Sequence, residues 1–427
     1  MGEMMKILIK NGTIVNADGE RKANVLIEGE KITQITNAEP SADRVIDASD
    51  KLVFPGLIDM HVHFRDPGFT HKEDVLTGSK AAAAGGVTSC CPMANTRPVN
   101  DSPIITRDMV ARARELGVCD IFPVGAITSG FGGEKLTNMG AMKEAGCRFF
   151  SDDGLPVVSS DVMRAALEYA KFHGSFISSH SQDCTLGGKG VMNEGAVSMK
   201  LGLAGMPREQ EEIMIARDIL LAKLTGAHMH IAHVSSAWSL KLIELAKKEG
   251  VNVTCEVAPH HFTFSEEDVG AYDANFKMSP PLRTRGDVEA MKEGLKSGLI
   301  DVVATDHAPH AADEKKADFA KAPFGIIGLQ TLVPLTLALV REGVITLSDM
   351  ARVCSARPAQ LMGLDDRGVI AEGKLADVAI IDSNLKYVFD GRVNQSKAAN
   401  TPLWGKELTG AAVVTIKSGR VVWEFPR

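Results

Sequence analysis

Short apolar runs separated by turn residues occupy both ends of the chain. Runs of this kind, rich in β-branched side chains, are typical of strands in meanders and hairpins. They lie at residues 6–9, 24–33, 376–382, 413–417 and 420–424, with turn dipeptides at residues 18–19, 28–29 and 418–419. Neither end has enough strands for a stable core of its own. We therefore expect residues 1–54 and 366–427 to form one composite β domain, a small β-sandwich.

Between these ends the pattern changes to apolar runs that alternate with helix-like segments. Eight short runs suited to buried strands lie at residues 56–63, 87–93, 119–126, 147–153, 175–180, 228–233, 251–257 and 300–306. Helical periodicity follows several of them, as at residues 161–172, 208–223, 237–249 and 287–296. Eight such units predict an α/β fold with a (β/α)8 TIM-like barrel over residues 55–365. A doubly wound sheet is the alternative, but no Gly-x-Gly-x-x-Gly follows the first run.

Metal-ligand residue types stand at the carboxyl ends of these predicted strands. They are His61 and His63, the adjacent pair Asp152 and Asp153, His180, His233 and Asp306. Because the carboxyl ends of barrel strands meet at one face, residues far apart in sequence converge there. Any one of these histidines alone would more often be structural, so the inference depends on their shared position. Four imidazoles with carboxylates, and no thiolate, indicate a site for zinc or a similar divalent ion.

The adjacent carboxylates Asp152 and Asp153 are not expected to face the same centre. Neighbouring side chains on a strand point to opposite faces, so only one of the two reaches the metal site. That carboxylate could bridge two ions, one beside the histidines of the first run and one beside those of the fifth and sixth. Two ions about 3.5–4 Å apart share a hydroxide that is nucleophilic near neutral pH. Asp306 could then bind a metal and act as general base and acid.

Three further polar residues near the predicted ligands suggest an anionic substrate. Arg65 closely follows the first histidine pair, where a dication would repel it unless an anion intervenes. Asn95 follows the second predicted strand, and His310 follows the last. A substrate carboxylate would account for all three residues. The alternative for Arg65 is a salt bridge to its neighbour Asp66 or to another acid, and for Arg65 taken alone we favour this alternative.

Composition and charge exclude several other classes of protein. The 427 residues are 44% apolar and 24% charged with a net charge of −7, which disfavours disorder and a basic nucleic-acid-binding surface. The seven cysteines lack zinc-ribbon or redox spacing and fit a reducing compartment. The start of the chain has no signal-peptide core, and the longest apolar stretch, residues 329–340, is too short to span a bilayer. We expect a cytoplasmic protein without nucleic-acid or membrane partners.

Five motifs surround the candidate residues. They are DMHVHFRDPG at residues 59–68, NTRP at 95–98, SDDG at 151–154, KMSPPLR at 277–283 and TDHAPH at 305–310. Together they resemble the dihydroorotases, class I branch, of the amidohydrolase superfamily, and the resemblance covers nearly the whole chain. It implies a zinc enzyme of pyrimidine biosynthesis that interconverts N-carbamoyl-L-aspartate and L-dihydroorotate.

Carried over by motif, the resemblance gives each candidate residue a role. The implied zinc ligands are His61 and His63 for one ion, His180 and His233 for the other, Asp153 as the bridge, and Asp306. Asp306 would also be the catalytic proton shuttle. Arg65, Asn95 and His310 would hold the substrate carboxylate. The resemblance further implies a homodimer, and a complex with aspartate transcarbamoylase could accompany it.

Two departures from related sequences bear on these roles. Many amidohydrolases bridge their metals with a carboxylated lysine after the fourth strand, but residues 147–156 contain no lysine. The bridge is then Asp153 between two zinc ions, which we favour, or the site holds a single tightly bound ion. Ser279 stands where relatives often have a substrate-binding Asn, and its shorter hydroxyl could make that contact through water. Residues 311–321, after the last predicted strand, are an ordinary surface loop or a lid that excludes water.

Two alternative functions remain beside this one. Allantoinases and hydantoinases resemble the same family, but they usually have the bridging lysine and act on rings without a carboxylate. The second alternative is a non-catalytic, dihydroorotase-like subunit that serves as a structural partner of aspartate transcarbamoylase. Such subunits tend to lose metal ligands, whereas this chain retains every proposed ligand. The sequence therefore favours an active cyclic amide hydrolase.

Overall fold

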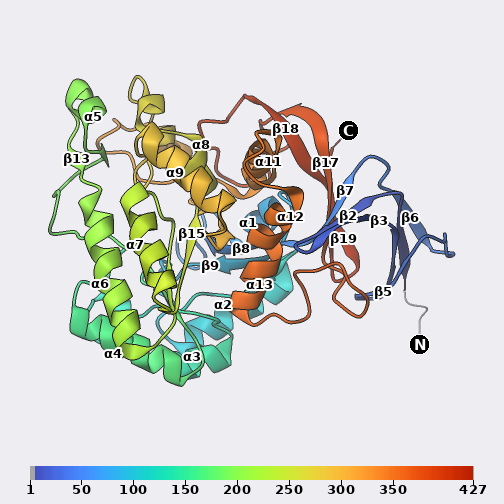
Figure 1. Ribbon diagram of the computed structural model, residues 1–427, viewed down its shortest axis with the longest axis horizontal. Helices are drawn as coiled ribbons and strands as arrows, with labels where there is room; N and C mark the ends of the chain where they lie inside the picture. The colour runs from blue at the N-terminus through green and yellow to red at the C-terminus, as the bar shows by residue number, and fades with distance from the viewer. Residues whose placement is uncertain (1–4, 427) are drawn as a thin grey trace.

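Both ends of the chain contribute strands to the same sheet in the computed structural model, which describes residues 5–426 (Figure 1). The strands of the two chain ends, which form two sheets, are β1 (Lys6–Lys10), β2 (Thr13–Asn16), β3 (Gly19–Lys22), β4 (Asn24–Glu28), β5 (Lys31–Thr36), β6 (Arg44–Asp47), β7 (Leu52–Pro55), β17 (Val378–Val388), β18 (Glu407–Lys417) and β19 (Arg420–Glu424). A six-stranded sheet has the order β19-β18-β17-β7-β2-β3, and a four-stranded sheet has the order β5-β4-β1-β6. Strand β7 pairs antiparallel with β17, with Val53 opposite Ile380, so the early and late parts of the chain meet within one sheet.

One hydrophobic core joins these two sheets. It includes Ile9 and Ile27 from the four-stranded sheet and Val53, Ile380 and Ile416 from the six-stranded sheet, all almost fully buried. Burial of such β-branched side chains is the main force that holds the two sheets together. Since residues from both chain ends are needed to complete the core, neither end can form it alone.

Parallel strands form the centre of the rest of the molecule. They are β8 (Leu57–Val62), β9 (Val87–Pro92), β10 (Asp120–Ile121), β11 (Ile177–Ser179), β14 (Met229–Ile231), β15 (Val253–Val257) and β16 (Val302–Val303). They pair in parallel in the orders β10-β9-β8 and β11-β14-β15-β16. A parallel bridge between Val62 and His307 leads from the segment after β16 back to β8.

The fourth predicted run, residues 147–153, connects these two groups of strands without forming a named strand of its own. Phe150 makes single parallel bridges to Gly125 on one side and to Ile177 on the other. Its N–H donates to the Phe176 carbonyl, and its carbonyl accepts from Ser178 N–H. The parallel pairings therefore continue through all eight predicted runs.

Helices follow the strands as the sequence pattern predicts. The longer ones are α1 (Val75–Ala84), α2 (Pro103–Leu116), α4 (Ser160–Phe172), α6 (Glu209–Thr225), α7 (Ala237–Lys248), α9 (Arg285–Lys296) and α11 (Leu332–Arg341). The shorter ones are α3 (Met139–Ala145), α5 (Ala196–Leu201), α8 (Pro259–Thr263), α10 (Ala312–Lys315), α12 (Leu347–Ala351) and α13 (Arg357–Met362). The four helices predicted by range are present with ends within two residues of those expected.

Two smaller features complete the fold. The short parallel pair β12 (Met192–Asn193) and β13 (Gly205–Met206) flanks α5 and is tied to the 277–283 segment, because Arg283 donates to the Asn193 side chain and to the Met206 carbonyl. Across residues 5–426, every helix is too short or too polar to cross a bilayer.

Candidate metal centre and substrate cavity

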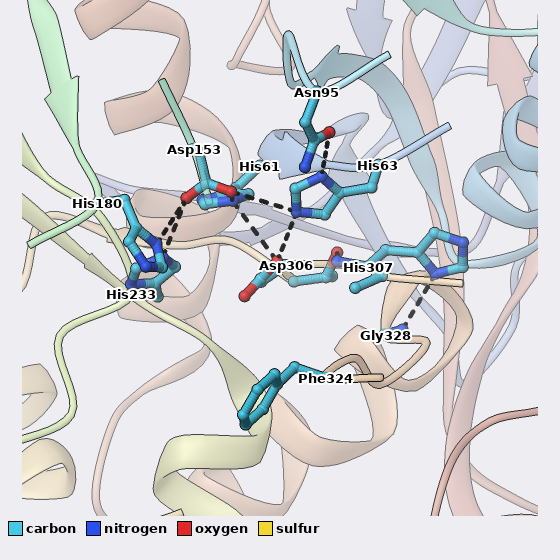
Figure 2. A network of polar contacts seen from close by, with 12 residues as sticks. His61, His63, Asn95, Asp153, His180, His233, Asp306, His307, Phe324 and Gly328 are labelled. Carbon is cyan, nitrogen blue, oxygen red and sulfur yellow. Dashed lines mark hydrogen bonds and ion pairs between the residues drawn. The ribbon is translucent and has the colours of Figure 1, made fainter. Parts of the chain in front are cut away.

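Six buried side chains at the carboxyl ends of the parallel strands converge on one point (Figure 2). Their ligand atoms form three groups, each within 4.8 Å: His61 with His63 and Asp153, Asp153 with His180 and His233, and His61 with His233 and Asp306. The structure thus brings together every residue that the sequence singled out as a metal ligand.

Asp153 lies between the two histidine pairs and turns one carboxylate oxygen toward each (Figure 2). Its Oδ2 is 3.4 Å from His61 Nε2 and 3.5 Å from His63 Nε2. Its Oδ1 is 3.1 Å from His180 Nδ1 and 3.2 Å from His233 Nε2. A carboxylate in this position can serve two ions at once.

Asp152 points away from this centre, in agreement with strand alternation. Its Oδ1 accepts hydrogen bonds from the backbone N–H groups of Ile127 at 2.7 Å and Thr128 at 3.1 Å. Its Oδ2 accepts from the Thr128 hydroxyl. Asp152 therefore fixes the backbone that leads to Asp153 and takes no part in the metal centre.

Asp306 follows β16 and faces the first histidine pair. Its Oδ1 is 3.0 Å from His63 Nε2 and 3.5 Å from His61 Nε2. Burial opposes its charge, but the neighbouring imidazoles of His61 and His63 prevail and lower the pKa of Asp306 to about 2. The carboxylate is therefore ionised at neutral pH and can accept a proton.

Three of the four imidazoles have a partner on the nitrogen that faces away from the centre. These pairs are His61 Nδ1 with Glu256 Oε1 at 2.6 Å, His63 Nδ1 with Asn95 Oδ1 at 2.9 Å, and His180 Nε2 with Gln182 Oε1 at 3.0 Å. Each partner oxygen accepts a hydrogen bond from the imidazole N–H, which leaves the other ring nitrogen with a lone pair directed at the centre.

The arrangement of donors and acceptors fits a divalent cation. His61 Nε2 is buried without a hydrogen-bond partner among the described residues and faces the Asp153 carboxylate. Burial would lower the pKa of His61, but Asp153, Asp306 and Glu256 raise it well above its usual range. The three carboxylates therefore favour a positive charge at this position. Imidazole nitrogens and carboxylate oxygens without thiolates suit zinc and related ions.

Three site residues adopt backbone conformations that side chains rarely take. The φ angles are 59° at Arg65, 31° at His233 and 48° at Asp306. Each of these residues lies just beyond a parallel strand, where the chain turns sharply and aims the side chain into the site. Left-handed conformations in residues other than glycine carry a cost of about 1–3 kcal/mol and concentrate at functional sites.

A cavity of about 820 Å³ opens beside the metal centre. The candidate substrate-binding residues that line it are Arg65, Asn95, Ser279 and His310. The salt bridge considered between Arg65 and Asp66 is wrong, because Asp66 pairs with Arg112 at 3.1 Å. Arg65 instead donates to the Pro309 carbonyl at 3.3 Å and has no ion pair within residues 5–426. Burial lowers the pKa of Arg65 to about 10, so its guanidinium stays charged at neutral pH.

The other three wall residues present different polar groups to the cavity. The Ser279 hydroxyl and the Asn95 amide nitrogen make no hydrogen bond with any described residue. His310 already donates its Nε2 proton to the Phe324 carbonyl at 2.8 Å. Burial, together with Arg65 and Lys72, lowers the pKa of His310 to about 3, so this imidazole is neutral.

The segment after Asp306 folds over one side of the cavity. Its residues 320–324 line the cavity wall, and α10 lies within the predicted loop of residues 311–321. Two buried lysines hold it by backbone carbonyls: Lys277 Nζ donates to Phe319 and Ala320, and Lys315 Nζ donates to Pro323 and Gly325. This segment is therefore anchored to the site and is not an independent surface loop.

Two residues of the site escaped the sequence analysis. Glu256 is a carboxylate inside the apolar strand β15, 2% exposed, and it also accepts from His230 Nε2 at 3.1 Å. A single charge within an apolar run was a signal that could have indicated it. Gln182 follows His180 by two residues, and nothing in its type or spacing distinguishes it from a loop residue.

Comparison with known proteins decides the family. The chain is 48% identical to a dihydroorotase of Pelobacter propionicus over 98% of this chain and 100% of that one. It is 47% identical to a dihydroorotase of Geobacter metallireducens over the same shares. The chain belongs to the dihydroorotase family. Consistently, a model described as dihydro-orotase-like matches residues 50–239, and one described as the amidohydrolase family matches residues 226–423.

Solved structures related to this family have the same α/β fold. An L-hydantoinase (dihydropyrimidinase) from Arthrobacter aurescens is 27% identical, with a TM-score of 0.90 over 99% of this chain and 97% of that one. A dihydropyrimidinase from Brevibacillus agri is 25% identical, with a TM-score of 0.84 over 99% and 95% of the two chains. The amidohydrolases are metal-dependent enzymes, in keeping with the His and Asp groups described above.

Proposed function

We propose that this chain is a zinc-dependent dihydroorotase that interconverts N-carbamoyl-L-aspartate and L-dihydroorotate in pyrimidine biosynthesis. The main support is that two features occur at the same cavity. Imidazole pairs lie on both sides of the Asp153 carboxylate, and the charged Arg65 lacks an ion pair among the described residues. The first suits hydrolysis of a cyclic amide, and the second suits a substrate that carries a carboxylate. Curated relatives named dihydroorotase that match over the full chain support the same function.

The metal-binding part of the proposal assigns two zinc ions to each subunit. His61 and His63 would hold one ion, His180 and His233 the other, and Asp153 would bridge them. When bound, the ions supply an activated water molecule and polarise the amide carbonyl. Glu256, Asn95 and Gln182 would keep three of the imidazoles in the tautomer that binds metal.

Asp306 would be the catalytic acid and base as well as a metal ligand. In hydrolysis its ionised carboxylate takes a proton from the attacking water and delivers it to the ring nitrogen as the carbon–nitrogen bond breaks. Ring closure reverses these steps: the carboxylate removes a proton from the carbamoyl nitrogen as that nitrogen attacks, and water leaves. The position of Asp306, 3.0 Å from His63 and on the cavity wall, supports this role.

The carboxylate of the substrate would bind at the wall formed by Arg65, Asn95, Ser279 and His310. Arg65 would supply charge and two parallel hydrogen bonds, and the Asn95 amide nitrogen one more. Ser279 would reach the substrate through water. His310 would have to exchange its bond to the Phe324 carbonyl for one to the substrate, because its ring proton is already donated.

The proposal extends to the architecture and setting of the enzyme. Parallel pairing through all eight runs and back to β8 supports a closed (β/α)8 barrel over residues 55–365. The shared core of the two terminal sheets supports a β-sandwich from residues 1–54 and 366–427, of which residues 1–4 and 427 lie outside the described part.

Seven free cysteines among the described residues favour a reducing cytoplasm. A homodimer and a complex with aspartate transcarbamoylase are further proposals that size analysis with and without that enzyme would test.

A hydantoinase-type activity is the second candidate, because the structural relatives above include an L-hydantoinase. Turnover of dihydroorotate, hydantoin and allantoin by the zinc-loaded protein separates the two. We expect turnover of dihydroorotate, little of the uncharged rings, and loss of turnover in Asp306→Ala. Turnover of hydantoin or allantoin in place of dihydroorotate would contradict the proposal.

We also propose that the loop of residues 311–321 is a lid, together with residues 322–324, which continue it along the cavity wall. Its residues line the cavity wall, so substrate should stabilise the closed arrangement. Limited proteolysis should cut this segment more slowly in saturating N-carbamoyl-L-aspartate than without it. Equal cutting rates would show that the segment does not respond to substrate.

A further inference from the structure

Gln182 occupies a position between the metal centre and the substrate cavity. Its Oε1 lies 3.0 Å from His180 Nε2, and its side chain lines the same 820 Å³ cavity as His180. Its amide nitrogen makes no hydrogen bond with any residue of the described range. One end of the carboxamide is thus committed to a metal-facing histidine, and the other end is left to face the cavity.

The bond to Gln182 determines which nitrogen of His180 faces the centre. Because the amide oxygen accepts a hydrogen bond from the Nε2–H group, His180 Nδ1 carries the lone pair. That nitrogen lies 3.1 Å from Asp153 Oδ1 and 2.9 Å from His233 Nε2. In the opposite tautomer the Nδ1 proton would point into the proposed zinc position. A group that fixes the tautomer of a ligating histidine raises its affinity for metal.

Asn95 shows the same arrangement at the other histidine pair. Its Oδ1 accepts the proton of His63 Nδ1 at 2.9 Å, and its amide nitrogen also makes no hydrogen bond among the described residues. Two carboxamides therefore each connect one imidazole of the centre to the cavity. Asn95 was singled out from the sequence as a substrate contact, whereas Gln182 was not.

We propose that Gln182 is a positioning residue for His180 and, through its amide nitrogen, a hydrogen-bond donor to the anionic substrate. This inference rests on the proposed function for the identity of the substrate, but its metal-binding part does not depend on any substrate. A carboxamide suits both tasks, since its oxygen accepts a hydrogen bond and its nitrogen donates one.

Two substitutions separate these tasks. Gln182→Glu keeps an acceptor for His180 and replaces the donor with a negative charge. Gln182→Leu removes both groups at similar size. Zinc content after dialysis and affinity in competition with a chelator report the positioning role, while the KM for dihydroorotate reports the substrate contact. Gln34→Leu, at an exposed amide on β5, is the matched control.

We expect Gln182→Leu to weaken binding of the second zinc ion about 10- to 100-fold. We expect Gln182→Glu to retain zinc but to raise the KM about tenfold or more by repulsion of the substrate carboxylate. Gln34→Leu should match the parent protein in both measurements, and melting temperatures of the zinc-free proteins will show whether each variant is folded.

Unchanged zinc affinity in a folded Gln182→Leu protein would overturn the positioning role. A parental KM in zinc-loaded Gln182→Glu would overturn the substrate contact. Failure of the parent protein to turn over dihydroorotate would instead overturn the proposed function, and the zinc measurements would still decide the positioning role.

Discussion

At the scale of single residues, the site depends on groups that set the state of the metal-facing side chains. Glu256 shows this best, because one carboxylate accepts from His61 Nδ1 at 2.6 Å and from His230 Nε2 at 3.1 Å. Burial opposes its charge, but His61 and His230 prevail and hold the pKa of Glu256 well below its usual range. Glu256 therefore stays ionised and keeps His61 ready to bind metal.

Substitution of Glu256 by Leu should affect both metal binding and stability. His61 loses the acceptor that fixes its tautomer, so zinc affinity should fall about 10- to 100-fold. Two buried ring N–H groups lose their partner, at a cost to the free energy of unfolding of about 1–3 kcal/mol each. Chelator competition and urea unfolding measure the two effects.

Thr254→Val is the matched control for Glu256→Leu. The Thr254 hydroxyl bonds His230 Nδ1 at 2.8 Å and His228 Nε2 at 2.7 Å but does not contact His61. This variant should lose stability while its zinc affinity stays at the parental value. Equal losses of zinc affinity in the two variants would show that Glu256 acts only through general stability.

Arg65→Met should weaken binding of a charged substrate much more than binding of an uncharged one. A hydrogen-bonded guanidinium contributes about 1.5–3 kcal/mol to binding of an anion, or roughly a 10- to 150-fold change in affinity. The KM for dihydroorotate should rise by that factor, whereas slow turnover of uncharged hydantoin should change little. Steady-state kinetics with both substrates, at full zinc occupancy, make the comparison. A similar change for the two would place Arg65 away from the carboxylate.

The sequence identified the candidate ligands because strand periodicity and strand ends determine where side chains point. His61 and His63 share a face by two-residue spacing, and the same rule allows only one of Asp152 and Asp153 to face the centre. The family resemblance then selected Asp153. The absence of an ion pair at Arg65 was not predictable, since it depends on Arg112 of α2 approaching Asp66. Hydrogen bonds between segments far apart in the sequence likewise could not be predicted from the local spacing of residues.

At the scale of elements, the predicted helices agree closely with the structure, and the predicted strands are too long. Helix α9 begins with a reciprocal cap between Thr284 and Asp287, a local signal that the sequence carries. Strand β10 covers only Asp120–Ile121 of the predicted residues 119–126, although the N–H groups of Phe122 and Val124 still donate to the Cys90 and Pro92 carbonyls of β9. Beyond β16, Thr305 N–H donates to the side-chain carboxylate of Asp59 instead of to a backbone carbonyl of a neighbouring strand.

The lysines that hold the segment of residues 311–324 give it a dependence on pH. Burial and the charge of Lys277 lower the pKa of Lys315 to about 7, and burial lowers that of Lys277 to about 8. Neither ammonium contacts a carboxylate of the described residues; their hydrogen bonds go to backbone carbonyls. Protonation therefore costs more in the folded chain than in the unfolded chain.

Lys315→Met should reveal this cost in the pH dependence of stability. Between about pH 7 and the unfolded-state pKa of 10.5, the unfolded chain binds a proton that folded Lys315 has lost. The free energy of unfolding therefore rises with pH through this group, by at most about 1.4 kcal/mol per pH unit. Relative to Lys315→Met, the parent protein should gain stability from pH 7 to pH 9 in urea unfolding.

Lys316→Met tests whether the effect belongs to burial. Lys316 is the exposed neighbour of Lys315 and forms no ion pair within the described chain. The stability difference between this variant and the parent should be the same at pH 7 and pH 9. A flat difference for Lys315→Met as well would contradict the pH dependence assigned to the buried lysine.

At the scale of the whole molecule, the metal centre connects strands from distant parts of the sequence. Its proposed ligands extend from His61 to Asp306, so bound ions would hold one end of the parallel strands together. Without ions, several carboxylates and lone pairs face one another in a buried space, which is unfavourable.

Removal of metal should therefore lower the melting temperature of the whole protein. An ion present at 1,000 times its Kd stabilises the folded state by about 4 kcal/mol, which predicts a decrease on the order of 5 °C. Calorimetry before and after chelation, and after zinc is restored, measures this. Asp153→Ala is the control: chelation should change its melting temperature much less. No change in the parent protein would show that the centre does not bind metal under those conditions.

The joining of both chain ends in one sheet has a consequence for synthesis on the ribosome. Strands β2 and β7 emerge early, but their neighbour β17 begins only at Val378. At about 5–20 residues per second, the exposed edge of β7 waits roughly 15–65 seconds for its partner. During that interval the newly made chain presents unpaired strand edges to chaperones and to other nascent chains, whereas the parallel strands can already assemble in order.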